Sequence, residues 1–334
     1  FKFSQKSSSY YFNAAFDDLE SLVEKQKTIL VTDENIFNAH KRKFKGWNII
    51  VLKPGEEHKV QSTVDNIIRQ LVEFKTDRKS FIIGIGGGVV TDMTGYAASV
   101  YMRGIKFGFL PVSILAMVDA SIGGKNGIDV GVYKNLVGTI NQPEFLLYDT
   151  SFLKSLPAGE WVNGFAEVIK HACIKDARLF KELEQNNLKT YRKDINALGN
   201  LIKRNAIIKS NVVVADEFEQ GERKLLNFGH TWGHAIETRH QLPHGHAVSI
   251  GMAMACKLSE QLTGFKQTDR VIKVLEQYGL PVSLDVNKKE TFEVLKMDKK
   301  RVSASMNYVL LDNIGKAVVK NIAMEQLEEL IYKV

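Results

Sequence analysis

Short apolar runs alternate with amphipathic stretches through the first half of the chain. Runs of strand length occur at TILVTD, NIIVLKPGEE, SFIIGIGGG, FGFLPVSILAM and EFLLYDT. Apolar strands separated by helical segments are typical of a parallel sheet that is covered on both faces. The first half therefore predicts a Rossmann-like, nucleotide-binding α/β domain with a parallel sheet.

The pattern changes after residue 156. Apolar residues recur at helical spacing in the long stretches 166–185, 195–219 and 246–262. We therefore expect an α/β domain over residues 1–156 and a mostly α-helical domain over residues 157–334. The segment SASMNYVLLDNIGKAVVK predicts a short hairpin within the second domain.

Length and composition are those of a soluble globular protein. The 334 residues, 44% of them hydrophobic, provide enough apolar material for a large core and two domains. The longest charge-free apolar run, residues 107–118, is much shorter than the roughly 18 residues that a membrane span requires. No apolar leader segment stands at the start, and Cys173 and Cys256 form no CxxC pair. These features favour a cytoplasmic location.

The formal charge of +7 makes an anionic partner plausible. Lysines and arginines are spread along the chain and mixed with acids, as in KELEQNNLKTYRKD, which is typical of solvated helix faces. A small phosphorylated or carboxylated ligand is therefore favoured over nucleic acid, and no membrane partner is expected.

A run of three glycines, Gly86 to Gly88, follows one predicted strand and precedes a helix. Such a turn lets backbone N–H groups and the helix dipole meet a phosphate or diphosphate. Val89 takes the place of the last glycine of the GxGxxG fingerprint, so the turn departs from that motif. A tight turn without a ligand is the alternative.

A second glycine-rich segment, VDASIGGKNGIDVGVYKN, gathers several polar residues. They are Asp119, Lys125, Asp129, Lys134 and Asn135. Compact loops on a rigid sheet are where binding groups concentrate, and the lysines could hold phosphate or carboxylate. A surface loop with solvated lysines is the other interpretation, and spacing does not decide between them.

Glu167 lies in GFAEVIKHA, with Lys170 and His171 on the following turn. An exposed ion pair between Glu167 and Lys170 would contribute only a few tenths of a kcal/mol. The apolar residues around Glu167 indicate a partly buried helix face instead, where a carboxylate requires a partner or a metal.

The segment LLNFGHTWGHAIE places His230 and His234 one helical turn apart, and His244 follows soon after. Imidazole is a common zinc ligand, and catalytic zinc usually takes three protein ligands. Thr231 replaces the glutamate of HExxH, which excludes that hydrolase motif. Spacing alone leaves metal ligands and ordinary polar histidines as alternatives.

Taken in order, these motifs resemble the 3-dehydroquinate synthase family of the shikimate pathway. The resemblance runs through GEEHK, GGGVVTDMTGYAASVYMRG, VDASIGGKNGIDV, KNLVGT, GFAEVIKHA, DEFEQGERKLLNFGHTWGHAIE, LPHGHAVSIGMAMA and MDKK. It covers most of the chain. The fold it implies is dehydroquinate synthase-like, and the function is a lyase of chorismate and aromatic amino-acid biosynthesis.

The resemblance also changes the metal assignment that the histidine spacing suggests. It assigns a Zn²⁺ or Co²⁺ site to Glu167, His230 and His244, with His246 as the nearest rival for the third ligand. His234 becomes a catalytic acid or base, together with Glu219 and Lys170.

In this family, 3-deoxy-D-arabino-heptulosonate 7-phosphate becomes 3-dehydroquinate and phosphate. The implied steps are transient oxidation by bound NAD, β-elimination of phosphate, re-reduction and intramolecular aldol closure. The anionic substrate requires cations and hydroxyl-binding groups. The matching residues are Arg103, Asp119, Lys125, Asn135, Lys209, Arg223, Asn227 and Lys299, with Lys300 as an alternative to the last.

The same resemblance implies an NAD site, most of whose residues lie in the first domain. Its expected residues are Asp33, Glu56, Lys59, Gly87, Gly88, Val89, Asp92, Val112, Ser113, Lys134, Phe152, Ser155 and Asn163. Val112 and Ser113 stand where the family usually has two threonines, so one hydroxyl contact to the cofactor is expected to be lost. The interval from His234 to His244 is also short for the family.

The family further implies a homodimer whose domains close around substrate. Two other functions remain as alternatives: a related sugar-phosphate cyclase such as 2-deoxy-scyllo-inosose synthase, and a metal-dependent glycerol or polyol dehydrogenase. The dehydrogenase would accumulate NADH with its product, whereas the synthase would not.

Overall fold

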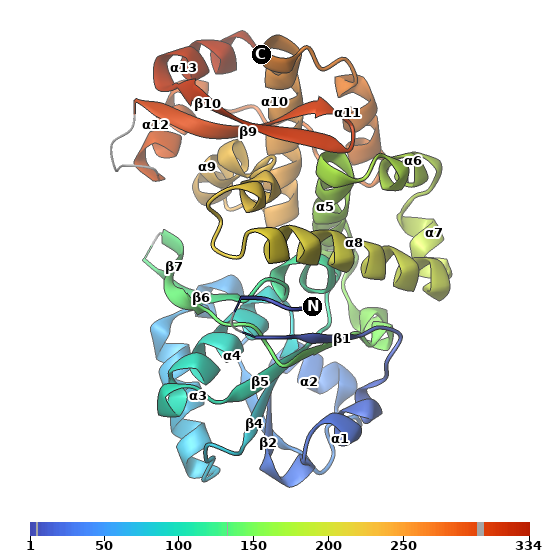
Figure 1. Cartoon of the computed structure of the whole chain (residues 1–334), viewed down its shortest axis with the longest axis vertical. Helices are drawn as coiled ribbons and strands as arrows, with labels where there is room; N and C mark the ends of the chain where they lie inside the picture. The colour runs from blue at the N-terminus through green and yellow to red at the C-terminus, as the bar shows by residue number, and fades with distance from the viewer. Residues whose placement is uncertain (5, 132, 299–303) are drawn as a thin grey trace. The chain divides into compact units, whose positions relative to one another are not determined.

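The computed structural model describes residues 1–4, 6–131, 133–298 and 304–334. It divides into two compact units, the first made of residues 1–160 with 195–217 and the second of residues 161–194 with 218–334. The first unit is α/β and the second mostly helical (Figure 1), which confirms the predicted fold class. The domain boundary expected after residue 156 stays a prediction. Helix α8 (Ile195–Ala215), which lies beyond that boundary in the sequence, clusters with the first unit.

A six-stranded parallel sheet forms the centre of the first unit, in the order β1-β8-β5-β4-β2-β3. The five predicted strands are all present. β1 has no counterpart in the sequence predictions because SYY is too short and polar to form an apolar run. The strands are β1 (Ser9–Tyr11), β2 (Thr28–Asp33), β3 (Asn48–Leu52), β4 (Phe81–Gly86), β5 (Lys106–Pro111) and β8 (Phe145–Leu147).

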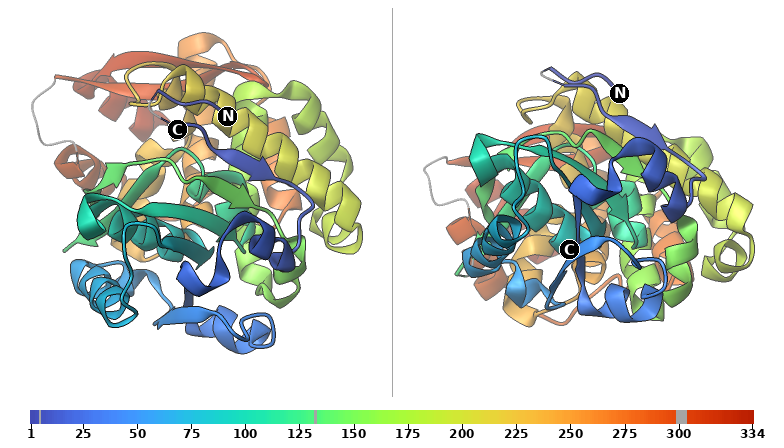
Figure 2. Two further views of the ribbon diagram at one scale, coloured as in Figure 1. Left: turned by 60° about the horizontal axis from the view of Figure 1, so that its bottom comes forward. Right: turned by 90° about the horizontal axis from the view of Figure 1, so that it is seen from below.

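Helices lie alongside this sheet (Figure 2). They are α1 (Leu19–Leu22), α2 (Glu34–His40), α3 (Gln61–Glu73), α4 (Gly88–Val100) and α8. Helix α4 packs on β4 and β5, while α2 packs on β2 and β3. The strands contribute Leu30, Ile83 and Leu110 to a core in which none of the three is exposed. Val31 and Ile82 point to the opposite face and are also fully buried. Burial on both faces explains why the strands read as continuous apolar runs.

The glycine-rich segment that the sequence suggests as a loop is largely a hairpin, β6 (Lys125–Val130) with β7 (Tyr133–Ile140). Gly127 pairs with Gly138 across the strands. A Cβ at Gly138 would lie 2.1 Å from the Asn126 carbonyl oxygen, and one at Gly127 would lie 2.7 Å from that of Val137. These two glycines therefore permit close approach of the strands, although Gly127 belongs to the segment that the sequence suggests as a loop.

The second unit consists of helices and one further hairpin. Its helices are α5 (Ala158–Lys175), α6 (Ala177–Gln185), α7 (Leu188–Lys193), α9 (His230–His240), α10 (His244–Thr263), α11 (Thr268–Gln277), α12 (Lys288–Asp298) and α13 (Met324–Lys333). The predicted helical stretch 166–185 is divided at Asp176, whose carboxylate accepts the N–H groups of Arg178 and Leu179 and so begins α6. The predicted hairpin is confirmed as β9 (Ser305–Asn313) with β10 (Lys316–Ala323).

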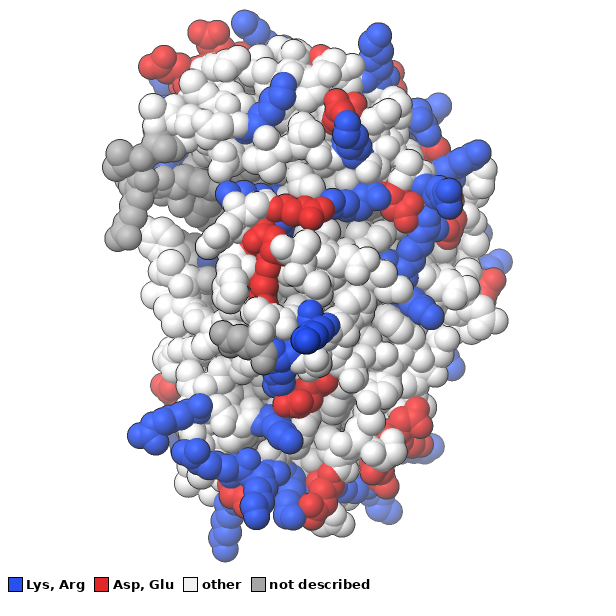
Figure 3. All heavy atoms as spheres, viewed as in Figure 1, with Lys and Arg blue, Asp and Glu red and all other residues white. Residues whose placement is uncertain are grey.

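Charges of both signs are mixed over the surface in view (Figure 3), with a group of basic residues at its lower edge. Across the described ranges, no helix is both long enough and apolar enough to cross a lipid bilayer.

Candidate functional site

The glycine turn joins the carboxyl end of β4 to the start of α4. Gly87 is the cap residue of α4 and brings no side chain to bond the first-turn amides. A Cβ at Gly88 would lie 3.1 Å from the Ala120 Cβ, and one at Gly87 would lie 3.6 Å from the Ser113 hydroxyl oxygen. The turn thus presents helix N-terminal amides with little side-chain cover, which suits the diphosphate of a dinucleotide.

Other expected cofactor residues lie near this edge of the sheet. Asp33 ends the neighbouring strand β2, and its carboxylate accepts the Ile36 N–H at 3.0 Å. Ser113 follows β5, and its hydroxyl accepts the Ala116 N–H at 3.1 Å. Val112 is buried. The remaining hydroxyl of the Val112–Ser113 pair therefore lies beside the glycine turn and also stabilises the turn after β5.

Lys59 is the centre of a buried polar network in the first unit. Its Nζ lies 2.6 Å from the Asp92 carboxylate on α4 and donates to the Asn135 amide oxygen at 2.6 Å. Burial raises the pKa of Asp92 to about 6 although Lys59 opposes it. Burial lowers the pKa of Lys59, but Asp92 and Glu56 outweigh it and the pKa rises. Lys59 therefore stays a cation. Its contacts join the expected cofactor residues Lys59 and Asp92 to the expected substrate residue Asn135.

Glu56 and Lys134 extend this network toward solvent, with Lys134 Nζ 3.4 Å from the Glu56 carboxylate. Asp119 and Lys209 form a separate pair, in which Lys209 Nζ lies 2.8 Å from the Asp119 carboxylate and donates to its carbonyl oxygen at 2.7 Å. These contacts bring expected substrate-binding residues together within the first unit.

Several expected residues lie apart from these groups. Arg103 is exposed just before β5, at the amino edge of the sheet and opposite the glycine turn. Phe152 is fully buried in the core, and Ser155 bonds its carbonyl oxygen and the His40 ring. The Phe152 ring therefore serves packing. Lys125 begins β6 and is exposed. Lys299 and Lys300 lie outside the described residues.

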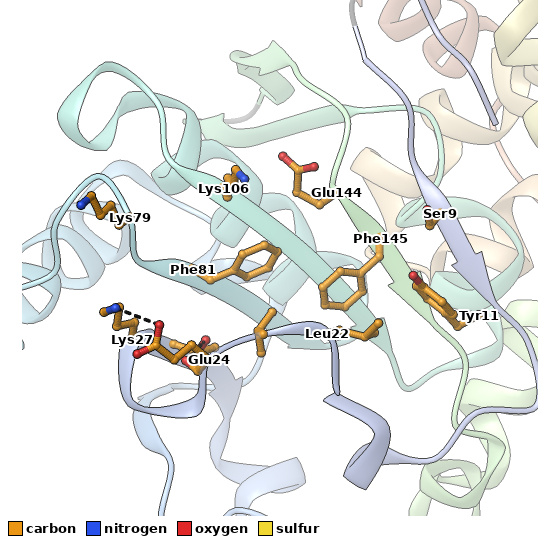
Figure 4. Close-up of a pocket in the computed structure, with 12 residues that line it drawn as sticks. Ser9, Tyr11, Leu22, Glu24, Lys27, Lys79, Phe81, Lys106, Glu144 and Phe145 are labelled. Atoms are coloured by element: carbon orange, nitrogen blue, oxygen red, sulfur yellow. Dashed lines mark hydrogen bonds and ion pairs between the residues drawn. The ribbon is translucent and has the colours of Figure 1, made fainter. Parts of the chain in front are cut away.

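A cavity of about 340 Å³ also lies at the amino edge of the sheet (Figure 4). Its lining includes Phe81 and Phe145, whose rings are stacked with centroids 5.5 Å apart, and Lys106 at the start of β5. The carboxyl ends of α3 and α4 point toward this edge, which disfavours a phosphate there. The cavity contains none of the residues that the sequence motifs predict for a site.

The second unit brings Glu167, His230 and His244 together. His230 Nε2 lies 3.5 Å and His244 Nε2 lies 3.4 Å from the same oxygen of Glu167. Three donors about 2.1 Å from a tetrahedral ion stand about 3.4 Å apart. One carboxylate and two imidazoles are also a known catalytic zinc set. The residues therefore fit a divalent cation.

Hydrogen bonds at the opposite ring nitrogens orient both imidazoles. His230 Nδ1 lies 3.2 Å from the Phe228 carbonyl oxygen, and His244 Nδ1 lies 3.3 Å from the Glu237 carboxylate. The Phe228 carbonyl can only accept a hydrogen bond, so His230 must carry its proton on Nδ1. The Nε2 lone pair of His230 is then directed at Glu167. The sequence motifs suggest no role for Glu237, because only the turn between α9 and α10 places it beside His244.

Electrostatics differ between the two rings. Burial and the cation of Lys170 hold the pKa of His230 well below its usual range. Burial also lowers the pKa of His244, but hydrogen bonds to Glu167 and Glu237 outweigh it and raise the value to about 10. His230 is thus neutral at pH 7, and a metal cation must displace a proton from His244 in order to bind.

The ion pair of Glu167 and Lys170 is buried rather than exposed. Glu167 has no exposed surface and Lys170 is 1% exposed, and the two side chains are in direct contact. The interpretation as a weak surface pair is therefore wrong. A buried carboxylate held by a lysine and two imidazoles is a charge centre, which is where functional groups concentrate.

Close helix packing places His230 beside His244. A Cβ at Gly251 on α10 would lie 1.8 Å from the Gly229 carbonyl oxygen, and one at Gly233 on α9 would lie 2.9 Å from that of Ala247. Gly229 also adopts φ 81°, which favours glycine. The glycines of FGHTWGH thus allow α9 and α10 to approach closely enough for the two ligand rings to meet.

Asn163, an expected cofactor residue, lies in the second unit. It is 7% exposed on α5, and its amide oxygen accepts the N–H of Gly245 in the first turn of α10. It therefore anchors the backbone next to His244. His246 belongs to no cluster of possible ligands within the described part of the chain.

His234 is exposed on α9, with its ring centroid 5.2 Å from that of His230 and 6.3 Å from that of His244. It forms a second group of possible ligands with Glu237 and His244. Glu219 accepts a hydrogen bond from the Asn227 amide at 2.6 Å, and Arg223 is 3% exposed in the same segment. His234 thus lies beside the buried cluster, where a proton donor or acceptor can reach solvent.

Comparison with known proteins covers both units. Residues 49–163 match the family model described as 3-dehydroquinate synthase N-terminal, and residues 164–301 match that described as 3-dehydroquinate synthase C-terminal. A 3-dehydroquinate synthase from Campylobacter concisus (strain 13826) is 40% identical over 331 residues, which are 95% of this chain and 93% of that protein. One from Clostridium botulinum (strain Alaska E43 / Type E3) is 38% identical over 327 residues, 94% of this chain and 93% of that protein.

Solved structures agree at the level of the fold. A 2-epi-5-epi-valiolone synthase from Streptomyces hygroscopicus subsp. jinggangensis 5008, with NAD⁺ and Zn²⁺ bound, has a TM-score of 0.89 at 25% identity over 100% of this chain and 98% of that one. A 2-deoxy-scyllo-inosose synthase complexed with carbaglucose-6-phosphate, NAD⁺ and Co²⁺ has a TM-score of 0.83 at 24% identity, covering 99% of this chain and 98% of the other. Sequence identity is clearly higher to the two 3-dehydroquinate synthases than to these two solved structures. Because the family models for the N-terminal and C-terminal parts both match, the chain belongs to the 3-dehydroquinate synthase family.

Proposed function

We propose that the chain is a 3-dehydroquinate synthase, a lyase that converts 3-deoxy-D-arabino-heptulosonate 7-phosphate to 3-dehydroquinate and phosphate without net redox change. The observation that carries the proposal is the cluster of buried Glu167 with half-buried His230 and His244, in a chain of this family. Its donor separations of 3.4 and 3.5 Å suit a tetrahedral ion. The expected cofactor and cation are NAD and Zn²⁺ or Co²⁺.

When bound, NAD supplies a reversible hydride acceptor and the cation supplies a Lewis acid that acidifies the substrate hydroxyl. The chain itself binds and orients these partners. Glu167, His230 and His244 hold the cation, while the amides after Gly87 receive the cofactor diphosphate. Lys59 and Asp92 fix the polar edge of the same cofactor region.

Proton movement falls to side chains beside the metal cluster. His234 is exposed on the same helix as His230, so it can exchange a proton with substrate or water. Lys170 contacts Glu167 and brings a buried positive charge toward any anionic substrate group. Asp119, Asn135 and Asn227 are suited to substrate hydroxyls, and Lys209 to its carboxylate or phosphate.

A cyclase for another sugar phosphate is the closest alternative. Sedoheptulose 7-phosphate provides a useful comparison, because it has a neutral CH₂OH where the heptulosonate has a carboxylate and a hydroxyl at the carbon that is deoxy in the heptulosonate. If the cations recognise a carboxylate, turnover of the heptulosonate is expected to exceed that of sedoheptulose 7-phosphate by at least about 100-fold, the scale of one lost charged contact. Equal turnover of the two substrates would favour the other cyclase.

Metal dependence is the direct test of the proposed function. Protein supplied with NAD and Zn²⁺ is expected to release inorganic phosphate from the heptulosonate phosphate. A chelator should abolish that release, and added Zn²⁺ or Co²⁺ should restore it because both accept the same donors. Phosphate release that persists in chelated, metal-free protein would contradict the proposal.

A homodimer and a cytoplasmic location complete the proposal. The β6–β7 hairpin supports an association surface, since Tyr133, Leu136 and Ile140 are exposed large apolar side chains on one strand. Light scattering coupled to gel filtration is expected to give twice the chain mass of 37.6 kDa. A monomer at micromolar concentration would exclude the dimer. The two cysteines are free thiols, which suits a reducing compartment.

A further inference from the structure

Asp129 lies at an irregularity in the β6–β7 hairpin. Ile128 pairs with Val137 and Val130 pairs with Tyr133, so the register shifts between Ile128 and Val130. Asp129 alone therefore stands opposite residues 134–136 of β7. Bulges of this kind bend a strand and redirect its side chains, and they are frequent beside active sites. Asp129 is only 8% exposed, so its carboxylate is directed into the structure rather than to solvent.

The Asp129 carboxylate contacts two of the three residues that stand opposite it, Lys134 and Asn135. One oxygen accepts the backbone N–H of Asn135 at 2.7 Å, and the other lies 2.9 Å from Lys134 Nζ. The Asp129 backbone N–H in turn donates to the Lys59 carbonyl oxygen at 2.8 Å. One residue thus links the segment after β3 to Lys134 and Asn135 of β7.

The contact to Asn135 has a conformational consequence. Asn135 has φ 51°, which is a left-handed backbone conformation. This conformation costs a non-glycine residue about 1 kcal/mol, so surrounding contacts must stabilise it. The hydrogen bond to Asp129 holds the backbone in that conformation. With the backbone so placed, the Asn135 amide oxygen accepts Lys59 Nζ at 2.6 Å, and Lys59 contacts Asp92 on α4.

The base of the hairpin is held against α4. A Cβ at Gly95 would lie 1.9 Å from the Asn126 amide oxygen, so α4 and β6 pack in direct contact. The Asn126 amide nitrogen donates to the carbonyl oxygens of Gly124 and Asn141. Asp129 therefore extends from a strand that is anchored on α4.

A carboxylate is at first sight out of place here. It lies among residues that the proposed function assigns to an anionic substrate and an anionic cofactor, and its own charge repels both. Asp129 therefore contributes by positioning its neighbours rather than by attracting a ligand.

We propose that Asp129 is a positioning residue, which sets Asn135 and Lys134 for substrate and NAD through the hairpin bulge. The inference rests on the proposed function for the roles of those two residues. Asp129 itself touches neither ligand in this account and acts through its neighbours.

Two variants separate the two contacts. Asp129→Asn keeps an oxygen that accepts the Asn135 N–H but loses the ion pair to Lys134, whereas Asp129→Ala loses both. We expect Asp129→Ala to raise KM for the heptulosonate phosphate by about 10-fold to 100-fold, the range for a mispositioned contact. Asp129→Asn is expected to stay within about 3-fold of wild type in that KM and to change mainly the KM for NAD.

Hydrogen exchange provides a readout that does not depend on activity. The Asn135 amide is expected to lose protection in Asp129→Ala and to keep it in Asp129→Asn. Asp312→Ala is the matched control, because Asp312 is also a hairpin carboxylate paired with a lysine, Lys316, at 2.6 Å. It should leave KM and the exchange of residues 133–140 unchanged.

The outcomes distinguish this inference from the proposed function. Absence of phosphate release by the wild-type chain would contradict the proposed function itself. An active wild type with KM values and exchange in Asp129→Ala equal to those of Asp312→Ala would overturn the role of Asp129. Equal KM increases in the Asn and Ala variants would likewise overturn it, because a shared loss of charge would then explain both.

Discussion

The His230→Ala variant is expected to lose its metal and its activity together, whereas His234→Ala keeps the metal and loses turnover. His230 directs Nε2 at Glu167 from 3.5 Å with its tautomer set by the Phe228 carbonyl, while His234 is exposed on the next turn. Removal of an outer hydrogen-bond partner already costs about 10-fold to 100-fold in metal affinity, so loss of a ligand should cost more than 100-fold.

For His234→Ala, the expected loss is about 100-fold to 10,000-fold in kcat, the usual contribution of a general acid or base. Metal content by elemental analysis and kcat by phosphate release test the pair. His240→Ala, an exposed position on the same helix, is the control and should change neither quantity. Equal metal loss in both variants would restore the HxxxH pair as the ligand set.

The Gly251→Ala variant is expected to destabilise the second unit and to weaken its metal site. The added Cβ would lie 1.8 Å from the Gly229 carbonyl oxygen, so α9 and α10 must separate. Overpacking of a tight contact costs typically 1 to 3 kcal/mol and sometimes more, and we expect a loss of about 3 kcal/mol in the free energy of unfolding. The same displacement moves His230 away from His244, so Co²⁺ affinity should fall with stability.

Gly159→Ala is the matched control for that variant. It lies in the first turn of α5 with nothing within 4 Å of the added Cβ. Alanine there is expected to be neutral or to stabilise by up to about 1 kcal/mol. Denaturant midpoints and Co²⁺ titrations measure both variants. A Gly251→Ala protein as stable as wild type and with unchanged Co²⁺ affinity would show that the helices do not need this contact.

The strands of the first unit were predictable because they are buried on both faces. Adjacent residues such as Leu30 and Val31 point to opposite faces and are both buried, which gives continuous apolar runs that stand out from the helical segments between them. β1 was not predictable, since three residues of an edge strand carry no such pattern. Strand β6 is not visible in the sequence because a glycine such as Gly127 is compatible both with a loop and with a close strand contact.

The candidate metal site was predictable only in part from residue types and spacing. The His230 and His234 pair is visible in the sequence, but their different roles depend on α5 bringing Glu167 to His230. The contact between Glu167 and His230 joins residues that are far apart in the sequence, and no local pattern predicts it. Only the family resemblance indicates it. The same limit applies to Glu237 and Asn163. Glu237 lies on the preceding helix α9 and Asn163 on the distant helix α5, and only folding places them beside His244 and Gly245.

The ratio of phosphate released to NADH formed tests the central claim most directly. Given NAD at about one equivalent per active site and excess heptulosonate phosphate, the enzyme is expected to release phosphate over many turnovers with no accumulation of NADH at 340 nm, because each hydride returns to the substrate. NADH that rises in step with product, or phosphate release that stops after one equivalent, would contradict a synthase and favour a polyol dehydrogenase.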